Sequence, residues 1–65
     1  MKLQVNGNKF ELRGENLTDL IGQLGYENQR IALEVNSLIV PKSQHSKFIL
    51  SPGDKIEIIK AVGGG

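Results

Sequence analysis

The residues of this chain that could take part in chemistry lie at its C-terminus, in Lys60-Ala61-Val62-Gly63-Gly64-Gly65. Glycine lacks a Cβ atom, so such a segment can adopt any φ and ψ and can enter a narrow channel. We expect Gly65 to present an α-carboxylate, which must be activated, for instance as an acyl-adenylate, before a nucleophile attacks it. The chain has no G-x-x-x-x-G-K-[ST] loop with which to use ATP and Mg²⁺ itself. We therefore expect Gly65 to be the substrate of a partner enzyme, and this chain to be no enzyme and to bind no cofactor of its own.

The same glycines also have simpler interpretations. A glycine run is typical of a frayed terminus or a flexible linker. Here the run follows strongly patterned residues without a polar spacer, which favours a functional segment. We predict one domain over residues 1–62 and a flexible tail at Gly63, Gly64 and Gly65.

No other group of residues predicts catalysis or metal binding. His45 lies in Ser43-Gln44-His45-Ser46, but a Ser–His pair also needs an orienting acid and an oxyanion hole, so we interpret it as a solvated loop histidine. The chain has no cysteine, which excludes disulfides, zinc–thiolate sites, iron–sulfur clusters and thiol chemistry. The spacing of four acidic residues is typical of surface charge; these are Glu11, Glu15, Asp19 and Glu27.

The composition describes one small domain. The chain has 65 residues, 8 Lys and Arg against 7 Asp and Glu, and 38% hydrophobic residues. A net charge of +1 and only 2 Phe and 1 Tyr argue against nucleic-acid binding. No apolar run is long enough to span a membrane or to act as a signal peptide, so we expect a cytoplasmic protein.

Residues 1–13 predict a β-hairpin. Apolar residues alternate with polar ones on both sides of Asn6-Gly7, the strongest two-residue hairpin signal because both positions tolerate positive φ. This turn places Val5 opposite Asn8 and Leu3 opposite Phe10, so that apolar side chains share one face.

Residues 16–25 predict a short helix. Leu17, Leu20, Ile21 and Leu24 form one apolar stripe, and Gly25 is a natural C-terminal stop. Asn16 is suited to the N-cap, with Asp19 placed near the free N–H groups of the first turn. A helix this short must pack on a sheet.

The remaining chain predicts further strands at residues 30–36, 38–40 and 55–62, with a possible short strand at 48–50 and a loop or single turn at 42–47. Pro52 and Gly53 fit a type II turn. One helix between strands of a single sheet predicts an α+β domain, a β-grasp whose mixed sheet of four to five strands packs on one short helix.

The last strand also predicts a partner-binding surface. Ile56 and Ile58 face the core in this pattern, so Ile59 and Ala61 face outward and lead into the glycines. We expect Ile59, Ala61 and Val62 to contact a partner. The alternative is that Ile59 covers a minor cluster under the 42–47 loop.

The order of these motifs resembles the ThiS family, the ubiquitin-like β-grasp sulfur carriers of thiamin biosynthesis. The resemblance spans essentially the whole chain through five segments: Asn6-Gly7, 31–36, 39–42, 53–58 and 62–65. One departure is the absence of an aromatic residue after Pro41, where Gln44-His45-Ser46 stands instead.

This resemblance implies a role and a set of partners. An E1-like adenylyltransferase (ThiF-like) would use ATP and Mg²⁺ to adenylate Gly65, and a sulfur donor such as a cysteine desulfurase would convert the adenylate into a thiocarboxylate. Thiazole synthase (ThiG-like) would then accept the sulfur, with Gly63 and Gly64 supplying reach. The resemblance implies no nucleic-acid or membrane partner and a monomer when free.

Three alternatives remain open from the residues alone. The small subunit of molybdopterin synthase shares the chemistry, although it is usually longer than 65 residues. A ubiquitin-like protein modifier would join Gly65 to a target lysine. A plain interaction module would carry its glycines incidentally.

Overall fold

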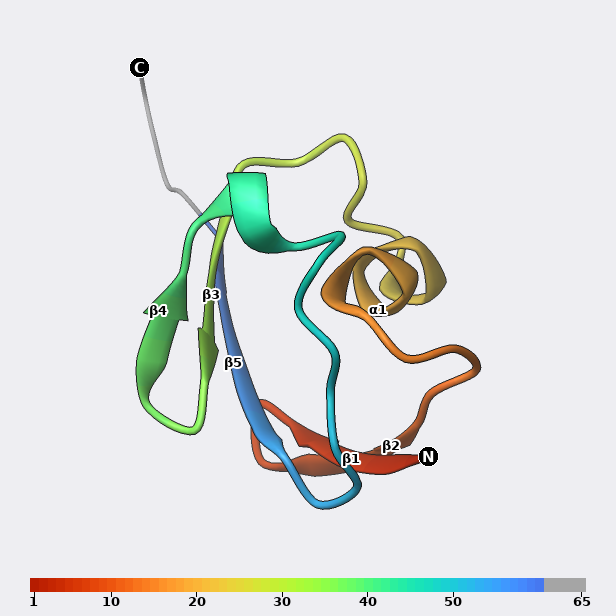
Figure 1. The fold of residues 1–65 in the computed structure, drawn as a ribbon. Coiled ribbons are helices and arrows are strands. Elements are labelled where there is room, and N and C mark those ends of the chain that lie inside the picture. Colours follow the sequence, from red (N-terminus) through yellow and green to blue (C-terminus); the bar gives the residue numbers. More distant parts are fainter. Residues whose placement is uncertain (61–65) are drawn as a thin grey trace.

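The computed structural model describes residues 1–60. Its elements are β1 (Lys2–Val5), β2 (Asn8–Glu11), α1 (Leu17–Leu24), β3 (Ile31–Val35), β4 (Leu38–Val40), the 3₁₀ turn η1 (Lys42–Gln44) and β5 (Lys55–Lys60). Figure 1 shows α1 on one side of the sheet formed by the strands.

The five strands form a mixed sheet in the order β2-β1-β5-β3-β4. β1 and β5 are parallel, and the other neighbouring pairs are antiparallel. The predicted β-grasp architecture, a mixed sheet on one helix, is therefore confirmed. β5 is the central strand of the sheet, between β1 and β3 (Figure 1).

The predicted N-terminal hairpin is confirmed in turn and register. Asn6 and Gly7 have φ of 49° and 83°, as a primed turn requires. Val5 pairs with Asn8 and Leu3 with Phe10. This register places Leu3 and Val5 in the core.

The predicted helix caps are also present. The Asn16 side chain accepts a hydrogen bond from the Asp19 N–H (2.8 Å), and the Asp19 carboxylate accepts one in return from the Asn16 N–H (3.2 Å). These two bonds form a capping box, and Gly25 ends the helix in the left-handed region at φ 80°. A further bond from the Glu15 N–H to Asp19 Oδ2 (2.9 Å) precedes the helix.

Residues 48–50 do not form a strand of the sheet. They make one isolated bridge, between Ile49 and Asn16, and the Leu50 N–H donates to the Glu15 carbonyl oxygen at 2.7 Å. Leu50 is buried in the core. The apolar run of this segment therefore reflects packing beside the start of α1 and not extension of the sheet.

The core lies between α1 and the inner face of the sheet. Its most deeply buried side chains are Leu12, Leu17, Leu20, Leu33 and Ile56. The interpretation of His45 as a solvated loop histidine is wrong, because this residue is only 5% exposed. η1 turns the chain inward after Pro41, and His45 Nε2 lies 3.0 Å from the carbonyl oxygen of Val40. This hydrogen bond satisfies the nitrogen and permits burial.

Candidate functional site

The candidate site is the end of β5, from which the chain continues into the glycines. Lys60 is the last described residue and pairs with Ile31 on β3. The predicted reactive residue Gly65, the predicted tail residues Gly63 and Gly64, and the predicted partner contacts Ala61 and Val62 lie outside the described residues.

A contact from outside the sheet holds the side chain of Lys60. Its Nζ lies 5.1 Å from the centre of the Tyr26 ring, a cation–π distance. Tyr26 follows α1, and its N–H donates to the Ile21 carbonyl oxygen at 3.0 Å. The loop after the helix thus braces the end of β5, a contact that the sequence pattern does not indicate.

The side of the sheet opposite α1 carries a cluster of exposed and partly exposed residues near this end. We define the outer face as Ala32 and Glu34 of β3, Ile39 of β4, and Glu57 and Ile59 of β5. Strand alternation places them there, since Leu33, Val40 and Ile56 between them are buried. The cluster is formed by the register of β3 with β4, which follows it directly, and with β5, which is distant in sequence.

Ile59 is 53% exposed, which confirms the prediction that it faces outward. It lies opposite Ala32, and Ile39, which is 73% exposed, lies opposite Glu34. Sequence reasoning missed Ile39, because its place depends on the pairing of β3 with β4. Ile59 near the end of β5 and Ile39 on β4 are exposed apolar side chains on one face of the sheet, which suits contact with another protein.

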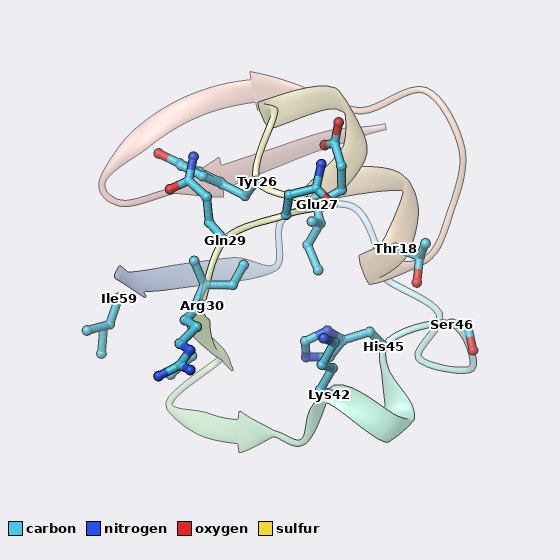
Figure 2. Close-up of a pocket in the computed structure, with 13 residues that line it drawn as sticks. Thr18, Tyr26, Glu27, Gln29, Arg30, Lys42, His45, Ser46 and Ile59 are labelled. Atoms are coloured by element: carbon cyan, nitrogen blue, oxygen red, sulfur yellow. The ribbon is translucent and has the colours of Figure 1, made fainter. Parts of the chain in front are cut away.

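A pocket of about 800 Å³ opens beside the same end of the sheet. Its walls come from α1, from the loop before β3, from η1 and from β5 (Figure 2). Arg30, Lys42 and His45 line it together with Ile59. Ile59 thus lines this pocket while about half of its surface remains exposed, and its alternative role as the cover of a cluster under the 42–47 loop stays a prediction.

The described residues assemble no catalytic or metal-binding group. His45 Nε2 is engaged by the Val40 carbonyl oxygen, and the neighbouring Ser46 carbonyl accepts a bond from Asn16 Nδ2 at 3.2 Å. Within residues 1–60, no three His, Cys, Asp or Glu side chains cluster to hold a metal ion. α1, the helix of this part of the chain, is too short to cross a membrane.

Two carboxylates have shifted pKa values, and both stabilise the fold. The Glu15 and Asn16 N–H groups hold the pKa of Asp19 below its ordinary value of 3.8. A hydrogen bond from the N-terminal ammonium lowers the pKa of Glu11 below 4.5, and these groups lie 2.9 Å apart. Both carboxylates are far in sequence from β5 and serve the N-terminal elements.

Comparison with known proteins identifies a family. The family model described as the ThiS family matches residues 3–65, a range that includes the three final glycines. A crystal structure of the thiamine biosynthesis protein ThiS from Geobacter metallireducens superimposes with a TM-score of 0.83 at 26% identity, covering 100% of both chains.

Two relatives of similar sequence identity differ in how much of their own length this chain covers. The sulfur carrier protein ThiS of Bacillus subtilis is 34% identical, and the match covers 97% of this chain and 98% of that protein. A thiazole synthase of Paramagnetospirillum magneticum is 38% identical over 100% of this chain, which spans only 20% of that protein.

Proposed function

Because this chain belongs to the ThiS family, we propose that it is a sulfur carrier for assembly of the thiazole ring of thiamin. The observation that carries the proposal is the match of the family over residues 3–65, which includes the three glycines that follow β5. The described residues offer a folded support for such a segment and no reacting group of their own.

The proposed chemistry takes place on the carboxyl group of Gly65. Its oxygen attacks the α-phosphorus of ATP, pyrophosphate leaves, and an acyl-adenylate forms. The terminal sulfur of a cysteine persulfide on the donor protein then attacks the carbonyl carbon and displaces AMP. A thiol reduces the resulting acyl disulfide, which leaves a thiocarboxylate on Gly65 and a new disulfide on the donor side.

The catalysts of these steps are partner proteins in this proposal. An E1-like adenylyltransferase supplies the site for ATP and Mg²⁺, and a cysteine desulfurase supplies the persulfide. Thiazole synthase accepts the sulfur, which is supported by the likeness of this chain to a fifth of a protein of that name. That likeness also favours the thiazole pathway over molybdopterin synthesis.

The fold would serve the reaction by positioning the glycines. β5 is held by β1 on one side and by β3 on the other, and Tyr26 contacts its last described residue. Residues 61–65 span at most about 17 Å when extended. A partner that docks on the outer face must therefore hold its reactive site within about that distance of the end of β5.

The test is the intact mass of the chain after incubation with a ThiF-type adenylyltransferase, ATP, Mg²⁺, a cysteine desulfurase, cysteine and a thiol. The proposal predicts a mass gain equal to the difference between one sulfur and one oxygen atom, dependent on ATP. Conjugates with other proteins would instead support a protein modifier. No change in mass with any of these components would contradict a carrier role.

A further inference from the structure

The outer face contains an unusual pair of like charges. Glu34 on β3 and Glu57 on β5 are directly opposite each other in the antiparallel register. Side chains opposite each other in such a pair have Cβ atoms about 5 Å apart, and like charges there destabilise a sheet. Both carboxylates lie on the same side of the sheet because Leu33, Val35 and Ile56 next to them are buried.

Neither carboxylate of this pair forms an ion pair within residues 1–60. The ion pair within this part of the chain joins the N-terminal ammonium to Glu11, on β2. Lys55 is the nearest cation along β5 on the same face, but it forms no ion pair with either carboxylate. Both carboxylates lie on the solvent side of the sheet, with Glu57 exposed and Glu34 partly buried, and neither forms an ion pair with a described residue.

Apolar side chains lie on both sides of the pair. Ile39 is opposite Glu34 on β4, and Ile59 is two residues beyond Glu57 on β5. These isoleucines are 73% and 53% exposed. A partner that covers them excludes water around the carboxylates, and the lower local dielectric strengthens a charge interaction there.

We propose that Glu34 and Glu57 together bind an arginine side chain of the adenylyltransferase, seated between Ile39 and Ile59. This inference rests on the proposed function and adds the chemical character of the partner surface. A guanidinium fits because its five N–H donors lie in one plane and can reach two neighbouring carboxylates at once. A positively charged partner also relieves the repulsion within the pair, so the pair favours the complex over the free protein.

The test compares Glu34→Gln, Glu57→Gln and the double variant with Glu15→Gln. Glutamine keeps the size of each side chain and removes the charge. Glu15 is exposed on the loop before α1, away from the outer face, and so controls for the loss of one charge. The measurements are the Kd for a purified ThiF-type adenylyltransferase by calorimetry without ATP, the KM of the chain in ATP–pyrophosphate exchange, and the thermal unfolding midpoint.

The proposal predicts opposite effects on binding and on stability. Each single variant should raise Kd and KM about tenfold, and the double variant more, with kcat unchanged. The unfolding midpoint should stay the same or rise, because repulsion is removed. Binding by the double variant should also depend less on salt concentration. Glu15→Gln should bind as the wild type does.

Other results overturn the proposal. Equal Kd values for the double variant, the wild type and Glu15→Gln would contradict it. A lower unfolding midpoint in both single variants would assign the pair a structural role instead. If the wild type binds but is not adenylated, the proposed function fails while the Kd series still decides the role of the pair. No binding by the wild type would refute both.

Discussion

On the solvent side of the sheet, β1 and β2 place opposite charges together, whereas β3 and β5 place like charges together. Lys2 lies opposite Glu11, which also contacts the N-terminal ammonium at 2.9 Å. Glu34 instead lies opposite Glu57. The two regions belong to one sheet, and in both the side chains alternate between its two faces. The pairs therefore differ only in which residues stand at the cross-strand positions on the solvent side.

This difference separates a stabilising region from a binding region. In the N-terminal region, defined as residues 1–25, the hairpin turn, the capping box and the charge pairs all favour the folded state. The outer face carries exposed isoleucines and a repelling pair, of which Glu57 lies on the strand that leads to the glycines. Changes in the first region should therefore alter stability, and changes in the second should alter partner binding.

The largest expected effect is on the proposed function, and it comes from a change in the glycines that follow the binding region. Deletion of Gly64 and Gly65 should abolish sulfur charging by a ThiF-type adenylyltransferase and a sulfur donor, because the reacting carboxyl group is displaced. The thermal unfolding midpoint should not change, since a glycine has no side chain to pack and the core residues that the structure describes all precede residue 61. A clear loss of thermal stability on deletion would show that the glycines belong to the folded domain.

Gly14→Ala should destabilise the N-terminal region. Gly14 has φ of 110°, and a Cβ there would lie 2.4 Å from Asp19 Oδ2, an atom that accepts bonds from two backbone N–H groups. We expect a loss of about 1–3 kcal/mol in the free energy of unfolding, measured with urea.

Gly22→Ala is the matched control. It lies inside α1, and no atom comes within 4 Å of an added Cβ. It should raise the stability by up to about 1 kcal/mol. Equal effects of the two substitutions would refute the importance of the Gly14 conformation.

Ile59→Ser should weaken binding to the adenylyltransferase about tenfold, because about half of this side chain is free to be buried by a partner. Its effect on the free energy of unfolding should stay near 0.5 kcal/mol, as for other exposed positions.

Ile49→Ser is the control for this change. Ile49 is 56% exposed, nearly the same as Ile59, but it lies beside the start of α1 and off the outer face. Calorimetry should show unchanged binding for this variant. Similar weakening by both substitutions would mean that the partner does not distinguish the outer face from other apolar surface.

The smallest expected effect is a pH dependence confined to the N-terminal region. The pKa values of Asp19 and Glu11 are lowered in the fold, so their carboxylates stabilise it above the ordinary values of 3.8 and 4.5. This contribution should disappear as the pH falls below those values. Urea unfolding from pH 6 to pH 2 should show a shallower decline in Asp19→Asn, and an identical decline would contradict this assignment.

The sequence predicts those features that depend on neighbouring residues. The Asn6-Gly7 turn fixes the register of the hairpin, and the Asn16 cap, the leucine stripe and Gly25 fix the helix. Each of these signals depends only on residues close together in the chain, so it can be identified in a single sequence without knowledge of the tertiary structure. The β-grasp architecture follows because so short a helix must cover a sheet.

The features that the sequence missed depend on the exact path of the backbone, at short separations along the chain as well as long ones. His45 is buried because η1 turns it toward the Val40 carbonyl oxygen. Glu34 meets Glu57, and Ile39 joins the outer face, only through the register of β3 with β5 and β4. The need for glycine at Gly14 likewise arises from the position of the Asp19 carboxylate. None of these has a local sequence signal.

The most direct test of this account is the position of the sulfur in the charged chain. Fragmentation of the intact protein in a mass spectrometer should place the added mass in fragments that contain Gly65 and in none that end at Gly64. Sulfur located anywhere within residues 1–60 would contradict the account, because the folded domain would then take part in the chemistry itself.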